Sequence, residues 1–592
     1  MRNKQRTLRL IGGALLLSLL LGVLALTLPA GSAVSAQEPV TLVETHADPE
    51  DYVWDSADVT QIALSDGAIT VDGTGATANG STVTITAAGN YSFSGTLADG
   101  QIIVDTEDDG FVRLILNGVT ISNSSSAPIY AANADDVMIV LADSTTNVIT
   151  DSPNYVFASA EEDEPNAAVF SKADLTIYGN GSLTVNANYN DGIASKDGLI
   201  IASGTITVNA LDDGVRGKDY LVIDTAALTI NAGGDGLKSD NEEDAGAGYI
   251  AITNGVFNIT AGGDAISAYT SVQISDGQFP LVSGGGSMAS IADTESAKGI
   301  KSDLSVQIDG GTFTISAADD ALHSNGSVTV NGGTLTMASA DDGMHADAAL
   351  TVNGGAITIT NAYEGLESAV ITLNGGSVTL NASDDGVNAS SGDGGGFGMS
   401  AASAGTYLYI NGGYLAVNAV GDGIDVNGAI TMTGGVVVVN GPTEQMNGAL
   451  DFDAGFTMTG GWLVAAGSAG MVQTLNDTST QPSLLLNFTA TQAAGTLVHL
   501  QSSDGTDVLT FAPSKAYQSI TFSSPELTQG TYDVYLGGSS DGTATNGVYS
   551  GGSYTGGTLY TNFTVSSMIT TVGSAGGMGM GGGRGARGGG RP

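Results

Sequence analysis

A 22-residue repeat in the middle of this chain constrains its fold more than any other feature. "SAADDALHSNGSVTVNGGTLTM" occupies residues 316–337, and "SADDGMHADAALTVNGGAITIT" follows at residues 339–360 in almost the same pattern. The small residue after the repeated acid recurs at intervals of 22 residues as Gly299, Ala321, Gly343 and Gly365. A unit this short cannot bury its apolar side chains alone, so neighbouring units must stack.

Each unit holds three short β-prone runs between glycine-rich corners, and stacked coils pair such runs at ~4.8 Å spacing. The position after the small residue is apolar in ten units, which predicts an inward column, and alternation turns the next position outward. The inward column is Ile193, Val215, Leu237, Ile266, Ile300, Leu322, Met344, Leu366, Val387 and Ile424. We therefore predict an all-β, right-handed parallel β-helix, a solenoid with about 22 residues per coil.

The repeat also predicts the domain boundaries. Residues 37–110 contain β-prone runs that we expect to cap the solenoid, which covers residues 111–483. Two longer intervals, of 34 and 37 residues, hold Gly/Ser-rich insertions typical of surface loops. Residues 484–572 lose the period and predict an antiparallel C-terminal cap or small β-sandwich, followed by a disordered Gly/Arg tail at 573–592.

Residues 1–36 have the organisation of a signal peptide. Four basic residues precede an apolar run, and "SAVSA" at residues 32–36 offers small side chains for cleavage. We expect a secreted protein, with an uncleaved anchor as the alternative and membrane contact only through this segment. The chain has no cysteine, which excludes disulfides and thiolate metal sites.

Acidic residues dominate the charge and recur just before the small residue of each unit. The formal net charge of −45 excludes nucleic acid as a direct partner. Carboxylates stacked at one-coil spacing repel each other, and calcium, which accepts 6–8 oxygen ligands, would relieve that repulsion. The predicted calcium ligands are Asp191, Asp212, Asp213, Asp235, Asp240, Asp319, Asp320, Asp341, Asp342, Asp384 and Asp385. The alternative is that each aspartate only makes the turn and caps backbone N–H groups.

The outward column next to these acids changes character along the chain. It carries Arg216, Lys238 and Lys301 in the earlier units and His323 and His345 in the later ones. Two stacked imidazoles are too few ligands for a transition metal without nearby carboxylates, so we interpret the histidines as surface residues.

The chain resembles a bacterial family of secreted carbohydrate-binding domains with a pectate-lyase-like β-helix. The resemblance rests on "AAGNYSFSGTLADGQIIVDTEDDGFVRLILNGVTIS" (87–122), "SKADLTIYGNGSLTVNANYNDGIASKDGLII" (171–201), "DDGVRGKDYLVI" (212–223) and "GDGLKSDN" (234–241). It implies a bacterial, extracellular or cell-surface protein that binds calcium and plant polysaccharides such as cellulose and pectic acid. By position it places calcium-type acids at Asp191, Asp212, Asp213 and Asp235, beside the basic residues Arg216 and Lys238.

Three functions remain open from the sequence. The first is calcium-dependent binding of a polysaccharide by a monomer, with contacts from Lys218, Lys301, Tyr189, Tyr220 and Tyr269. The second is a calcium-dependent pectate or polysaccharide lyase that acts by β-elimination, with Lys238 or Arg216 as the base. The third is a structural role in which the basic residues only neutralise neighbouring aspartates.

Overall fold

A computed structural model describes residues 41–48, 52–53, 58–292, 294–391 and 405–574. These residues form strands β1 to β53, and the all-β prediction is confirmed. The predicted signal peptide, most of the second insertion and all but two residues of the predicted tail lie outside the described residues. In the part of the chain that the structure describes, no helix has the length and apolar character needed to cross a bilayer.

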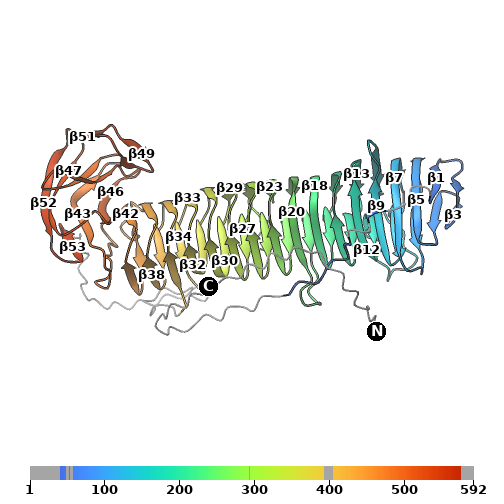
Figure 1. Ribbon diagram of the computed structural model, residues 1–592, viewed down its shortest axis with the longest axis horizontal. Helices are drawn as coiled ribbons and strands as arrows, with labels where there is room; N and C mark the ends of the chain where they lie inside the picture. The colour runs from blue at the N-terminus through green and yellow to red at the C-terminus, as the bar shows by residue number, and fades with distance from the viewer. Residues whose placement is uncertain (1–40, 49–51, 54–57, 293, 392–404, 575–592) are drawn as a thin grey trace, which may run out of the picture. The chain divides into compact units, whose positions relative to one another are not determined.

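Most strands belong to three columns, in each of which a strand pairs in parallel with the equivalent strands of the coils before and after it (Figure 1). The first column carries the outward residues identified above. Its strands are β8 (Ile129–Asn133), β11 (Ala167–Ser171), β14 (Asp191–Ser195), β17 (Val215–Gly217), β19 (Leu237–Ser239), β21 (Ile266–Ala268), β24 (Ile300–Ser302), β27 (Leu322–Ser324), β30 (Met344–Val352), β32 (Leu366–Leu373), β34 (Val387–Ala389), β37 (Ile424–Val426) and β40 (Asp451–Phe452).

The other two columns complete each coil. The second contains β9 (Asp136–Leu141), β12 (Asp174–Gly179), β15 (Gly198–Ile201), β18 (Tyr220–Ala232), β20 (Tyr249–Ala261), β22 (Ser271–Ile274), β25 (Ser305–Ile308), β28 (Ser327–Val330), β35 (Tyr407–Ile410), β38 (Ala429–Met432) and β41 (Gly455–Met458), joined by the second halves of β30 and β32. The third contains β10 (Thr146–Thr150), β13 (Ser182–Ala187), β16 (Thr205–Ala210), β23 (Gln278–Ser283), β26 (Thr312–Ala317), β29 (Thr334–Ser339), β31 (Ala356–Asn361), β33 (Ser377–Ala382), β36 (Tyr414–Ala419), β39 (Val436–Asn440) and β42 (Trp462–Gly467), joined by the ends of β18 and β20.

The core lies inside the stack of coils. All ten residues of the predicted inward column are fully buried, from Ile193 through Met344 to Ile424. Phenylalanines of the third column continue the stacking inside, with ring centroids 4.6 Å apart between Phe257 and Phe279 and 4.5 Å apart between Phe279 and Phe313. The hydrophobic effect of these continuous apolar columns holds neighbouring coils together.

The N-terminal strands enter the stack earlier than the sequence indicates. They are β1 (Val59–Leu64), β2 (Thr70–Asp72), β3 (Ala76–Asn79), β4 (Thr82–Ile85), β5 (Gly89–Leu97), β6 (Gln101–Asp105) and β7 (Phe111–Ser122). Parallel pairing already joins β1 to β5 and β4 to β6, so residues before 110 belong to the stack. Antiparallel pairs of β1 with β2 and of β3 with β4 finish this end.

The C-terminal strands form a mainly antiparallel region that continues from the third column, because β46 pairs antiparallel with β42. β43 (Ser483–Gln492) and β46 (Tyr517–Ser523) pair antiparallel, and β53 (Ile569–Val572) adds to β43. A second sheet contains β44 (Val498–Ser502), β45 (Asp507–Phe511), β47 (Gly530–Leu536), β49 (Thr543–Thr545), β50 (Val548–Ser550) and β52 (Thr558–Val565), while β48 (Ser539–Ser540) and β51 (Tyr554–Thr555) form a small hairpin. Phe488, Phe511 and Phe522 belong to one buried cluster shared by the two larger sheets.

Candidate functional site

The acids that precede the first-column strands form a ladder of hydrogen bonds. One carboxylate oxygen of Asp213 accepts the backbone N–H of Asp235 one coil later at 2.9 Å, and Asp320 accepts that of Asp342 at 2.9 Å. Equivalent hydrogen bonds, in which the carboxylate of the earlier acid accepts the backbone N–H of the acid one coil later, join Asp191 with Asp213, Asp235 with Asp264, Asp342 with Glu364 and Asp385 with Asp422. Backbone capping therefore accounts for one oxygen of each of these accepting aspartates, and the second oxygen is left for another partner.

The outward column is in register with this ladder. Strand pairing places Arg216 beside Lys238, Lys301 beside His323 and His323 beside His345. It then continues from His345 through Glu367, Asn388, Asp425 and Asp451. The partner available to each second oxygen consequently changes along the stack, and three segments can be distinguished by that partner.

The first segment of the outward column, which we call the basic segment, carries Arg216, Lys238 and Lys301, with Ser267 between the two lysines. The Lys238 Nζ lies 3.0 Å from an oxygen of Asp213 and 3.0 Å from one of Asp235. The Arg216 guanidinium pairs with Asp240 at 2.8 Å, and the Lys301 Nζ lies 3.6 Å from Asp264. Four of the five calcium ligands predicted between Asp191 and Asp240 have the protein's own cations beside them, namely Asp191, Asp213, Asp235 and Asp240.

The same ion pairs determine the protonation of Lys238. Burial opposes a charge on its amine, but the carboxylates of Asp235 and Asp213 outweigh burial and raise the Lys238 pKa above its usual range. The pKa of Arg216 is likewise raised, because Asp240 and Asp191 outweigh its desolvation. A general base must first lose its proton, so this geometry disfavours both residues in the role that a lyase would require.

Lys298 separates the basic segment from the histidines. It stands where other units have the acid, and its Nζ lies 2.7 Å from Asp319 and 2.9 Å from Asp320. Carboxylate oxygens of Asp319, Asp320 and Asp341 lie within 4.8 Å of one another, as the sequence predicts for a calcium site. The amine of Lys298 already contacts two of these three acids, which reduces the charge available to an ion.

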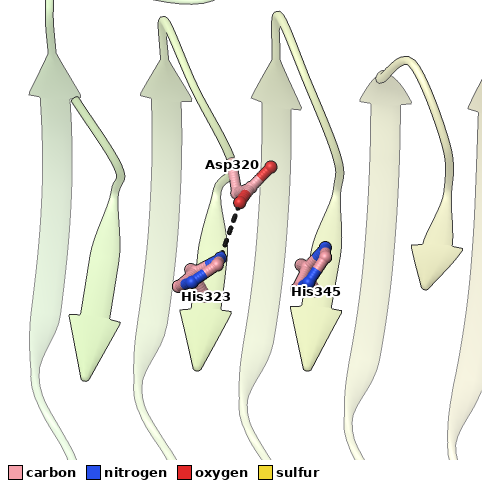
Figure 2. A group of neighbouring side chains, drawn as sticks. All are labelled: Asp320, His323 and His345. Carbon is pink, nitrogen blue, oxygen red and sulfur yellow. Dashed lines mark hydrogen bonds and ion pairs between the residues drawn. The ribbon is translucent and has the colours of Figure 1, made fainter. Parts of the chain in front are cut away.

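Two histidines form the second segment, which we call the histidine segment (Figure 2). The His323 Nδ1 lies 2.7 Å from Asp320, and the His345 Nδ1 lies 3.1 Å from Asp342 and 2.7 Å from Glu367. Burial opposes a charge on the ring, but hydrogen bonds to Asp342 and Glu367 outweigh it and raise the pKa of His345 to about 11. The histidines are thus part of the ladder and not the isolated surface residues that the sequence suggested.

The third segment, the acidic segment, consists of Asp385, Asp422, Asp425 and Asp451. Carboxylate oxygens of the first three lie within 4.8 Å of one another, and Asp425 is in register with Asp451. Among the described residues, no lysine, arginine or histidine forms an ion pair with any of the four. Burial, followed by the charges of neighbouring aspartates, raises the pKa of Asp425 to about 8. Burial and nearby aspartates also raise that of Asp422 to about 7.

The acidic segment contains the site residues that sequence reasoning missed. Asp385 was predicted, but Asp422 and Asp425 were not, because the 37-residue interval separates them from the doubled "DDG" units. The sequence does contain a signal for these residues, because the outward residue of each coil stands three positions after the acid of the ladder. That spacing relates Asp422 to Asp425 in the way that it relates Asp235 to Lys238.

The predicted carbohydrate contacts lie in different environments. Tyr220 is 4% exposed and packs against Tyr249, so its prediction as a sugar-stacking residue is wrong. Tyr269 is 40% exposed, and Tyr189 stacks on Tyr155 with ring centroids 4.1 Å apart. Lys218 lies 3.9 Å from Glu243 and remains partly exposed. Alternating residue positions cannot reveal the burial of Tyr220, because the segment at residues 41–48 covers an outward face there through Leu42 and Val43.

Part of the stack matches a known protein family. Residues 79–343 match the family described as carbohydrate-binding domain-containing protein. A relative of that description from Acetivibrio thermocellus is 50% identical over 128 residues, which are 22% of this chain and 45% of the relative. The chain therefore spans about half the length of this curated relative.

A solved structure is also similar. It is described as the polysaccharide lyase-like protein from C. thermocellum, in a gadolinium derivative, and is 35% identical in sequence. The alignment covers 46% of this chain and 96% of that chain, with a TM-score of 0.36.

Proposed function

We propose that this protein is a secreted, monomeric, calcium-dependent polysaccharide-binding protein built on a right-handed parallel β-helix. The match of residues 79–343 to the carbohydrate-binding domain family supports a glycan as the partner. The ladder of buried carboxylates supports calcium as the cofactor. The N-terminal residue pattern supports secretion.

The observation that carries the proposal is the acidic segment. Asp385, Asp422 and Asp425 bring their oxygens within 4.8 Å of one another without a basic partner among the described residues. A hard divalent cation fits this donor set, because all donors are oxygens and their mutual repulsion is otherwise uncompensated. Of the predicted calcium ligands, which run from Asp191 to Asp385, this favours Asp385 in the later coils over those between Asp191 and Asp240.

The donor set also suggests how a glycan would be held. Calcium accepts 6–8 oxygen ligands, so three carboxylates leave positions for water or for an acidic sugar. Tyr363 is 47% exposed and interacts with Asp384, the neighbour of Asp385, where its ring could face a sugar. An anionic glycan such as a pectic polymer matches this arrangement, because the glycan carboxylates would be attracted to the bound ion and not to the acidic protein surface.

Binding without cleavage is favoured over a lyase reaction. β-Elimination requires a base that removes the proton next to a uronate carboxylate, and Lys238 and Arg216 are each paired with carboxylates that keep them protonated. These pairs also lie in the basic segment and not beside the acidic segment where we place calcium.

The experiment is a pull-down of the protein on insoluble polygalacturonate with calcium or with chelator, together with ultraviolet absorbance to detect unsaturated products. We expect calcium-dependent retention and no product. Asp422→Asn with Asp425→Asn should abolish retention, whereas Asp240→Asn in the basic segment is the matched control and should retain it. Retention that ignores chelator, or that survives the double substitution, would overturn the calcium site, and product formation would overturn binding without cleavage.

A further inference from the structure

His323 and His345 are stacked side chains on neighbouring coils. They project from β27 and β30 in strict register, with ring centroids 4.9 Å apart and an interplanar angle of 22° (Figure 2). The chain contains four histidines, so this pair is half of its imidazole content. A lysine or arginine in this column can only form ion pairs with the acids, whereas an imidazole can also bind a metal ion.

Carboxylates surround the pair on the side facing the ladder. Oxygen and nitrogen atoms of Asp320, His323 and His345 lie within 4.8 Å of one another, and Asp320 is 3% exposed. A second group of this kind, Asp342, His345 and Glu367, shares His345. The carboxylates that the sequence reading found lacking are therefore present, because the acid three residues before each histidine faces it.

The outer ring nitrogens are held as well. The His323 Nε2 lies 2.9 Å from the side-chain oxygen of Asn325, and the His345 Nε2 lies 3.1 Å from Asp347. Hydrogen bonds to the second ring nitrogen set the orientation and tautomer of metal-binding histidines. Both Nδ1 atoms are thereby directed to the carboxylate side.

The charge balance also calls for a cation. Asp319, Asp320, Asp342 and Glu367 are opposed by one permanently charged side chain, Lys298, which contacts Asp319 and Asp320. Lys298 can keep its 2.7 Å pair with Asp319 while an oxygen of Asp320 turns to another ligand. A divalent ion bound at the two Nδ1 atoms would take the place of the protons shared with Asp320 and Asp342 and would keep positive charge beside these acids.

We propose that His323, His345 and Asp320 form a binding site for a divalent transition-metal ion of the zinc, cobalt or nickel type, bridging two coils of the histidine segment. Two imidazoles and a carboxylate are a ligand set that such ions prefer and calcium does not. Zinc–ligand bonds of ~2.0–2.1 Å place ligand atoms about 3.3 Å apart in a tetrahedral site, so modest rotation of side chains now within 4.8 Å suffices. Binding displaces the protons now shared between the Nδ1 atoms and the carboxylates.

The site is independent of the calcium proposal. Its donors include nitrogen, and it lies on β27 and β30, whereas the acidic segment is formed by oxygen donors near β34 and β37. Either site can therefore fail without the other, and the experiment below separates them.

The test is titration of the full chain, without an added histidine tag, with Co²⁺ while the visible absorption of the bound ion is recorded. We expect saturation at one equivalent and displacement by Zn²⁺ but not by excess Ca²⁺. His323→Lys with His345→Lys keeps a cation beside each acid, as in the basic segment, but removes both nitrogen ligands. This variant should bind Co²⁺ more weakly by about 100-fold or more, beyond the loss expected for an outer-shell partner.

His46→Gln is the matched control, because His46 contacts Tyr220 and Thr176 away from this column. It should bind Co²⁺ like the parent protein. No visible absorption in the parent, equal binding by the double lysine variant, or displacement by Ca²⁺ would overturn the proposal.

A measurement on the unaltered protein covers the case in which the lysine variant does not fold. Co²⁺ is paramagnetic, so it should broaden the imidazole resonances of two of the four histidines and spare those of His46 and His499. Broadening of all four resonances to the same extent, or of none, would overturn the site.

Discussion

Replacing Asp425 of the acidic segment by asparagine should stabilise the calcium-free protein, because the folded state opposes ionisation of this aspartate and the unfolded state does not. The pKa of Asp425 is raised to about 8 from 3.8, because burial and then the neighbouring aspartates oppose its charge. At pH 7.5 this corresponds to at most about 5 kcal/mol of local destabilisation, at about 1.4 kcal/mol per pKa unit. Solvent reaches part of the side chain and screens the repulsion, so we expect Asp425→Asn to stabilise these coils by about 2 kcal/mol in chelator.

The assay is native-state hydrogen exchange of peptides that span β37 to β39, because a stack of coils opens locally and not all at once. A gain of about 2 kcal/mol slows exchange from the open state roughly 30-fold. Calcium should slow exchange in the parent and have little effect in Asp425→Asn, whose amide supplies no charge. Asp240→Asn is the control and should show no slowing, because Asp240 loses its ion pair with Arg216.

Two results would refute this reasoning. If Asp425→Asn exchanges as fast as the parent in chelator, the aspartates of the acidic segment do not repel one another as the geometry indicates. If calcium protects the variant and the parent equally, the ion binds elsewhere. Both results are measured in the peptides that span β37 to β39, so a change in exchange that is confined to other coils cannot produce either result.

Three further predictions follow from the ladder. The calcium-free parent should become more stable in β37–β39 as pH falls from about 8 towards 5. The pKa is raised to about 8 for Asp425 and to about 7 for Asp422, so the folded state takes up protons in this range while the unfolded state does not. Hydrogen exchange, corrected for intrinsic exchange rates, measures the resulting change in local stability. Lys298→Ala should create an additional calcium site, because it frees Asp319 and Asp320, and calorimetric titration should count one more equivalent than in the parent. Lys238→Met should lower the urea stability of the basic segment by about 2 kcal/mol, because two largely buried carboxylates lose their shared cation, without changing retention on polygalacturonate.

Much of the architecture could be predicted from the sequence because the repeat is regular. A period of 22 residues returns equivalent side chains to the same column, so the inward apolar residues and the outward register from Arg216 to Asp425 follow from counting. Periodicity could not reveal where the stack begins. The strands β1 to β6 vary in length and spacing, yet β1 pairs in parallel with β5 like the later coils.

The location of the candidate site was harder to predict, because its identity depends on charge balance and not on acid content. The doubled acids of the earlier units suggested calcium near Asp213 and Asp235, yet a single amine, that of Lys238, satisfies both. Asp425 is preceded by fewer acids in sequence, but its neighbours across the coils are Asn388 and Asp451, neither of which is a cation. Only the three-dimensional pairing of columns shows which acids are left without a counter-ion.

A comparison of two ladders on the same stack explains why the acids require ions. At the "NGG" corners, the side-chain amide of Asn353 donates to Asn331 at 2.8 Å, and Asn374 donates to Asn353 at 2.8 Å. An amide both donates and accepts, so a column of asparagines satisfies itself from coil to coil. A carboxylate only accepts, so a column of aspartates must obtain its donors or positive charge from the backbone, from neighbouring columns or from solution. The backbone satisfies one oxygen of most aspartates in the ladder. In the basic segment Lys238 contacts the second oxygens of Asp213 and Asp235, and no described side chain supplies a charge in the acidic segment. The charge of the outward side chain that faces each acid, from its own coil or the next, therefore determines whether that acid has a counter-ion within the protein.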